Sequence, residues 1–211
     1  MSGLAGQHLA AIAFFAILLL FERFRRTPAL ALVRHPMFAY LARGTLVALY
    51  FAFAGIDPVL WLTVNAGTGV AIGIALAALL AIARRHDVVT LATSDPAMVA
   101  QAAYLALTVG VVEELIFRGA FVLVAAATPL ATVLASVGSA VAYALWRAVT
   151  YRDRDPRSLA VVFAANVAIG VVAGLAQSLW PALIAHAAHV VLAGPPRAPA
   201  RRAATPSAFR P

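Results

Sequence analysis

The chain has 211 residues, of which 64% are hydrophobic and 11% charged, and its mean hydropathy is +0.93. In a soluble globular domain about a quarter of the residues are charged, so this composition excludes that class. The chain has no cysteine, which excludes disulfides, thiolate catalysis and cysteine-ligated zinc.

Apolar runs of about 17 to 25 residues recur along the chain, which is the length that crosses a bilayer as a helix. No alternating ten-residue pattern indicates a β-barrel. We therefore predict an all-α fold, a polytopic membrane bundle of about seven transmembrane helices. In chain order, the helices are expected at about 6–22, 38–55, 59–82, 98–126, 130–147, 159–176 and 179–194. They form one membrane domain over residues 1–194, and a disordered basic cytoplasmic tail is expected over 195–211.

The net charge is +8, all sixteen basic residues are arginine, and most of the arginines gather in alternate connections between the apolar runs. The clusters are Arg23, Arg25, Arg26 and Arg34; Arg84 and Arg85; Arg147, Arg152, Arg154 and Arg157; and Arg197, Arg201, Arg202 and Arg210. The connections near Asp57, Thr128 and Ser178 carry no basic residue. This alternation follows the positive-inside rule and predicts an uncleaved first helix, an external N-terminus and an internal C-terminus. The expected contact of the arginines is anionic lipid headgroups, not nucleic acid.

The fourth segment begins with a helix-start signal, in which Asp95 is the expected cap and Pro96 the first helical residue. A continuous helix from Pro96 would place Glu113 about 26 Å along its axis. Gly110 permits a second arrangement, in which 96–109 lies near the surface or re-enters and the membrane span begins near Gly110. We favour the second arrangement, which leaves the topology unchanged.

Two adjacent acids, Glu113 and Glu114, stand in this apolar segment, although the whole chain has only eight acidic residues. Ionised groups in hydrocarbon are costly, so an intramembrane acid indicates a functional site. On a helix Glu114 faces Arg118 and can form an ion pair with it, whereas Glu113 points about 100° away and is free for another task. A general base acting on water is one such task. A structural polar cluster between helices is the alternative.

His186 and His189 lie three residues apart, on one face of the last predicted helix. They could donate hydrogen bonds to an oxyanion, relay protons or bind a metal, or they could satisfy backbone carbonyls between helices.

The stretch Glu113-Glu114-Leu-Ile-Phe-Arg118-Gly119 resembles the EExxxR motif of the CPBP family, which comprises CAAX proteases and bacteriocin-processing (Abi) proteins. The stretch from Gln177 to Ala187, with its Trp-Pro and His-Ala pairs, resembles the final motif of that family. Order and spacing also fit, and the resemblance covers roughly residues 95–193.

This resemblance implies a glutamate-dependent intramembrane endopeptidase of a bacterial or archaeal cytoplasmic membrane. In that scheme Glu113 activates water, Glu114 and Arg118 support it, and His186 helps to stabilise the oxyanion. The implied partner is a membrane protein or peptide substrate. No cofactor is required, although Glu113, His186 and His189 leave a divalent metal open.

Two positions depart from the family pattern. The middle motif has an aromatic residue followed four positions later by histidine, and the matching residues here are Tyr143 and Arg147. The final motif continues to an asparagine where this chain has Val190. Arginine cannot act as a base at physiological pH, but it can hold a carboxylate or an oxyanion. Tyr143, Arg147 and His189 are therefore possible supporting residues.

Two interpretations of function follow from these departures, and the polar residues of the predicted helices allow a third. The chain can be a divergent active protease, or a non-catalytic relative that acts in immunity or scaffolding by binding peptides or partners. A proton-coupled transporter would also need intramembrane Glu, Arg and His, but the chain lacks the internal repeat that transporter folds usually have. We expect the protease.

Overall fold

The structure, a computed structural model, describes residues 4–28 and 35–193. All regular elements within these ranges are helices, so the predicted all-α fold is confirmed. The tail predicted over 195–211 lies outside the described residues.

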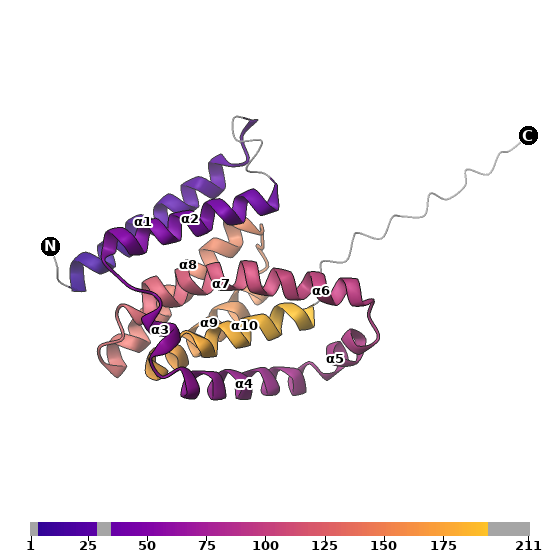
Figure 1. Cartoon of the computed structure of the whole chain (residues 1–211). Coiled ribbons are helices and arrows are strands. Elements are labelled where there is room, and N and C mark those ends of the chain that lie inside the picture. The colour runs from indigo at the N-terminus through magenta and orange to yellow at the C-terminus, as the bar shows by residue number, and fades with distance from the viewer. Residues whose placement is uncertain (1–3, 29–34, 194–211) are drawn as a thin grey trace, which may run out of the picture.

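Five helices in the described part of the chain are long and apolar enough to cross a membrane (Figure 1). They are α1 (Leu4–Phe24), α2 (Pro36–Ala54), α4 (Ala66–Ala83), α8 (Pro129–Thr150) and α9 (Pro156–Ala176). Shorter helices are α3 (Leu60–Thr63), α5 (Arg85–Ala92) and α10 (Trp180–Ala193). A chain with this many apolar helices is a multi-pass membrane protein, as its composition predicts.

The fourth predicted helix is a continuous helical path made of four parts. These are α6 (Pro96–Leu105), the π-helical η2 (Ala106–Gly110), α7 (Val111–Glu114) and the π-helical η3 (Leu115–Leu123). The predicted start is confirmed, because the Asp95 side chain accepts a hydrogen bond from Ala97 N at 2.8 Å and Pro96 is the first helical residue. The helical path continues through Gly110, which keeps right-handed helical angles.

The third predicted helix is divided, and the polar connection after it is partly helical. Asn65 adopts a left-handed conformation (φ 52°) between α3 and α4, and its side chain donates a hydrogen bond to Ala176 O at 3.2 Å. The connection between α4 and α6 contains α5.

The three connections without basic residues meet at one end of the bundle, on the left in Figure 1. Leu179 N donates to Trp61 O at 2.9 Å, and Gln177 Nε2 donates to Ala126 O at 2.9 Å. Arginine-bearing connections meet at the other end, where Arg26 donates to Val149 O at 2.7 Å. The helices therefore alternate in direction, as the arginine pattern predicts.

Glycine pairs spaced four apart allow two close helix contacts. A side chain at Gly170 or Gly174 of α9 would collide with Ser136 or Thr132 of α8, respectively. Gly69 and Gly73 of α4 face Ser178 and α10 in the same way. Such small-residue seams are a common basis of helix association in membranes.

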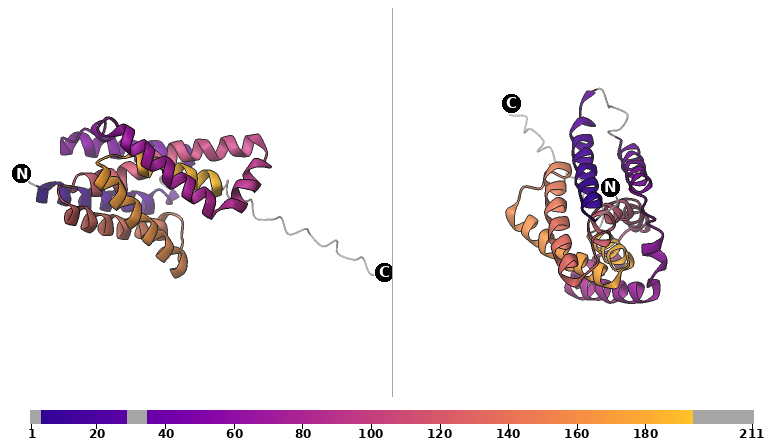
Figure 2. Two further views of the ribbon diagram at one scale, coloured as in Figure 1. Left: turned by 90° about the horizontal axis from the view of Figure 1, so that it is seen from below. Right: turned by 90° about the vertical axis from the view of Figure 1, so that its left-hand side faces the viewer.

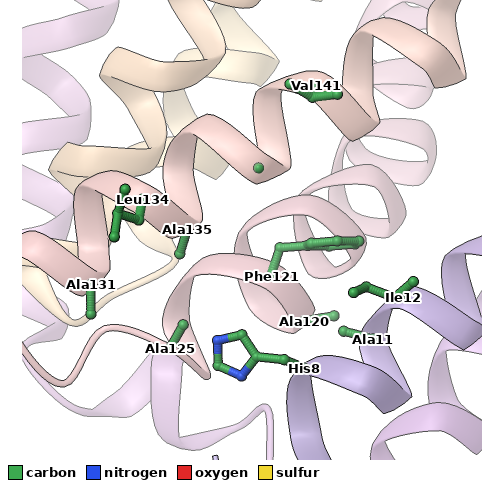
Figure 3. A pocket seen from close by; sticks show the side chains of 11 residues that line it. His8, Ala11, Ile12, Ala120, Phe121, Ala125, Ala131, Leu134, Ala135 and Val141 are labelled. Atoms are coloured by element: carbon green, nitrogen blue, oxygen red, sulfur yellow. The ribbon is translucent and has the colours of Figure 1, made fainter. Parts of the chain in front are cut away.

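The acid-bearing helix occupies the middle of the bundle, with the α1–α2 hairpin on one side and α4 on the other (Figures 1 and 2). An aromatic core joins the hairpin to this helix and α8 and includes Phe14, Phe15, Tyr50, Phe51, Phe117, Tyr143 and Trp146. A separate apolar cavity of about 590 Å³ lies between α1, η3 and α8, with the His8 ring at its wall (Figure 3).

Candidate active site

Glu113 and Glu114 are the last two residues of α7, between the two π-helical segments. Their side chains are buried, with 2% and 1% of their surface exposed. π-Helical turns within α-helices occur frequently at functional sites. Two neighbouring buried carboxylates on such a distorted helix require partners, and each has its own set.

Three donors surround the Glu113 carboxylate. Oε1 accepts hydrogen bonds from the Tyr151 hydroxyl at 2.7 Å and from Trp146 Nε1 at 3.1 Å. Oε2 accepts from the Tyr143 hydroxyl at 3.2 Å. All three donors come from α8 or the residue directly after it. Glu113 thus points away from Glu114 and Arg118, in agreement with the helical spacing, and its carboxylate accepts hydrogen bonds from three side chains.

Glu114 contacts a histidine and an arginine. Its Oε1 lies 2.7 Å from His186 Nδ1, and its Oε2 lies 3.1 Å from Arg118 Nε. The pairing of Glu114 with Arg118 thus agrees with the helical spacing. A Cβ atom at Gly110 would lie 3.4 Å from the His186 ring, so the glycine lets α10 approach the acid-bearing helix closely.

Arg118 connects the acid pair to α9. Its Nη2 donates to Asn166 Oδ1 at 2.6 Å, and Asn166 Nδ2 in turn donates to Val162 O at 2.7 Å. Arg118 is 2% exposed, and its Nη1 has no hydrogen-bond partner. The buried N–H groups of Nη1 are therefore left for a further acceptor.

A second cavity of about 590 Å³ lies beside this network. Its walls include apolar residues of α4 and α9 such as Leu76, Leu80, Val162 and Ile169. Its polar lining is Arg84, Glu114, Arg118, Tyr143, Arg147, Asn166, His186 and His189. Glu114 lines the cavity, whereas Glu113 lies behind the Tyr143 hydroxyl. An apolar cavity with a few convergent polar groups is the usual form of a small-ligand or substrate site.

Arg147 and His189 border the cavity but make their contacts elsewhere. Arg147 Nη2 lies 3.0 Å from Asp153 Oδ2, and His189 Nδ1 lies 3.5 Å from Arg84 Nη1. Hydrogen bonds from Ser158 and Arg147 lower the pKa of Asp153 below its usual value, so its carboxylate is ionised at neutral pH. Arg147, at the place of the family's middle histidine, is thus part of an ion pair in the α8–α9 connection.

In the described residues, no three histidine, aspartate or glutamate side chains are grouped so that they could hold a metal ion. The structure brings Glu113, Glu114, Arg118, Tyr143 and His186 into one connected site.

Sequence reasoning missed Trp146, Tyr151 and Asn166. Asn166 is a lone amide in an apolar helix, and this signal could have revealed it. Trp146 and Tyr151 carry no comparable signal, because aromatic residues are common near membrane boundaries.

The fold and the site define a class of protein, a multi-pass helical membrane protein with a buried acid pair beside a cavity. Residues 95–192 match the family described as "Rce1-like: Type II CAAX prenyl endopeptidase Rce1-like". The resemblance to the CPBP family of CAAX proteases, predicted from the two motifs, is therefore confirmed over this segment. The family supports protease activity in general. Neither a curated protein nor a solved structure gave a match to the chain.

Proposed function

We propose that the chain is a glutamate-dependent intramembrane endopeptidase and that the cavity beside Glu114 is its reaction chamber. The observation that supports this proposal best is the 2.7 Å contact between Glu114 and His186 at the cavity wall, with Arg118 beside it. Hydrolysis needs a base for water, donors for the oxyanion and a space that holds water, and this wall has groups for each need.

The reaction that we propose begins when a carboxylate accepts a proton from water. The oxygen of that water attacks the carbonyl carbon of the substrate, and an oxyanion forms. The His186 ring and the unpaired Nη1 of Arg118 are candidate donors to this oxyanion. The C–N bond then breaks as the amine receives the proton.

The base can be either member of the acid pair. The family pattern assigns it to Glu113, whose carboxylate accepts hydrogen bonds from Trp146, Tyr143 and Tyr151. The position of Glu114 on the cavity wall favours Glu114 instead. The two assignments differ in what the single glutamine variants are expected to do.

The substrate that we propose is a membrane-associated protein or peptide, cut near the cytoplasmic half of a bacterial or archaeal cytoplasmic membrane. The N-terminus is then external and the C-terminus internal, with the arginine clusters at anionic headgroups. The description of the matched family names prenyl endopeptidases. The cavity lining is mostly apolar, which suits a lipid-facing or apolar substrate segment.

The test compares peptide termini in membranes of cells that express the wild type, Glu113→Gln or Glu114→Gln at matched levels. A terminus that vanishes in both variants supports the acid pair as a unit. Loss in one variant alone assigns the base to that residue. If no terminus changes while the host phenotype survives both substitutions, catalysis is overturned and the non-catalytic binding interpretation replaces it.

A further inference from the structure

A second buried ion pair lies outside the segment that matches the family. Glu22 of α1 is 0% exposed, and Arg43 of α2 is 3% exposed. Arg43 Nη2 lies 2.7 Å from Glu22 Oε1, and Arg43 Nε donates to the same oxygen at 2.8 Å. Arg25 holds the other oxygen of Glu22 at 2.7 Å. Charged groups in transmembrane helices are rare and usually functional, so this pair requires an explanation.

The guanidinium of Arg43 extends the ion pair toward the acid-bearing helix. Its central carbon lies 5.0 Å from the centre of the Trp146 ring, and 5.0 Å from that of Tyr40. These distances permit cation–π contacts, which strengthen where water is excluded. Trp146 is fully buried, so Arg43 forms part of the wall that holds its indole in place.

The indole of Trp146 in turn contacts Glu113 of the candidate site. Trp146 Nε1 donates to Glu113 Oε1 at 3.1 Å. A chain of contacts therefore runs from Glu22 through Arg43 and Trp146 to Glu113. Each member is at most 3% exposed, so no member can take a new orientation without moving its neighbours.

We propose that Arg43 is a positioning residue for Glu113, which it orients through the Trp146 indole, and that Glu22 fixes Arg43. The α1–α2 hairpin is then part of the site architecture, although residues 95–192 alone match the family. The role in catalysis rests on the proposed function, whereas the positioning contact does not.

Tryptophan fluorescence tests the positioning contact separately from the role in catalysis. The chain has three tryptophans, so Trp61→Phe with Trp180→Phe leaves Trp146 as the single indole reporter. In this background Glu113→Gln is expected to shift the Trp146 emission, because the indole N–H loses a charged acceptor. The measurement uses the full chain, purified in detergent, with its helical content and elution profile checked for every variant.

The shift caused by Glu113→Gln is then measured again after a change at Arg43. We expect Arg43→Met to abolish the shift and Arg43→Lys to keep it, because lysine retains a cation near the ring. Arg25→Met is the matched control, since Arg25 contacts the same glutamate but makes no ring contact with Trp146. It is expected to keep the shift.

A Glu113→Gln shift that is as large in Arg43→Met as in Arg43→Lys would overturn the proposal, as would the absence of any shift in the starting background. Where proteolysis is detectable, Arg43→Met is expected to lower kcat with KM nearly unchanged, and Arg43→Lys is expected to restore it. Because the optical result needs no substrate, it remains decisive even if the proposed protease activity is refuted.

Discussion

The Arg118 guanidinium serves two buried partners on different helices, Glu114 on its own helix and Asn166 on α9. Charged groups of this kind are expensive to leave unpaired, because the desolvation cost remains when the partner is removed. The site therefore depends on Arg118 for its stability as well as for its chemistry.

We expect Arg118→Ala to lower the free energy of unfolding by about 3–5 kcal/mol, the usual cost of breaking a buried pair. Arg147→Ala is the matched control, since its pair with Asp153 is partly exposed and is worth about 1 kcal/mol or less. Denaturant unfolding in detergent micelles measures both. Equal losses in the two variants would contradict the role given to Arg118.

The two histidines should differ sharply in their effect on activity. His186 contacts Glu114 at 2.7 Å, whereas the polar contact of His189 is a long one to Arg84 at 3.5 Å. We expect His186→Gln to lower kcat by about 100-fold or more, the typical cost of losing an acid–base or oxyanion group. His189→Gln should change it less than about tenfold. A cleavage assay on an identified substrate measures kcat for both variants. A larger loss of kcat in His189→Gln than in His186→Gln would assign the oxyanion role to His189.

The residues that the sequence singled out lie together in the structure, but the sequence did not indicate the groups around them. Glu113, Glu114, Arg118 and His186 stand out because charged residues are rare in apolar helices. The donors to Glu113 come from α8, and no periodicity in the sequence specifies which faces of two distant helices meet. Glu22 and Arg43 carry the same signal of intramembrane charge, but no pattern in the sequence shows that their side chains meet.

At the scale of the elements, the seams between helices decide how the site is assembled. Gly174 of α9 lies against Thr132 of α8, and Gly170 lies against Ser136. This close approach fixes α9, which carries Asn166 to Arg118. The position of the candidate site thus depends on glycines that have no chemistry of their own.

A matched pair of glycine substitutions tests the α8–α9 seam. We expect Gly174→Ala to destabilise the protein by about 1–3 kcal/mol, because the added methyl group overpacks a filled contact. Gly138→Ala is the control, since nothing lies within 4 Å of its position. Alanine there should be neutral or stabilising by at most about 1 kcal/mol. Thermal unfolding in micelles measures the stability of both variants. An equal loss of stability in Gly138→Ala and Gly174→Ala would contradict the close contact between α8 and α9.

Most helix positions followed from the sequence, whereas interruptions did not. The length of the apolar runs predicts where the helices lie, and capping residues such as Asp95 predict where they begin. The division between α3 and α4 depends on Asn65 reaching Ala176 of α9, which is a contact between distant residues. The π-helical segments around the acid pair likewise have no distinct pattern in the sequence.

At the scale of the whole molecule, the two ends of the bundle differ in charge. The uncharged connections join one another by hydrogen bonds such as that from Gln177 to Ala126. The opposite end carries the arginines of the α1–α2, α4–α5 and α8–α9 connections. The positive-inside rule then predicts which end faces the cytoplasm.

The cysteine-free chain makes this orientation directly testable. Ala92 and Ala127 are both exposed alanines. Ala92 is the last residue of α5, in an arginine-bearing connection, whereas Ala127 lies in the uncharged connection before α8, at the opposite end. We expect a membrane-impermeant maleimide added to intact cells to label Ala127→Cys and to leave Ala92→Cys unlabelled until the cells are lysed. The reverse labelling would invert the proposed topology.

The ion pair between Glu22 and Arg43 also bears on how the chain is made. Membrane helices leave the ribosome in order, so the first hairpin must enter the bilayer before α8 exists. Because Glu22 and Arg43 neutralise each other within that hairpin, its two charges can be inserted without waiting for later helices. Glu114 likewise has Arg118 on its own helix. The three side chains that donate hydrogen bonds to Glu113 are synthesised about 30 residues later or more. The Glu113 carboxylate therefore gains these hydrogen bonds only after α8 has been made.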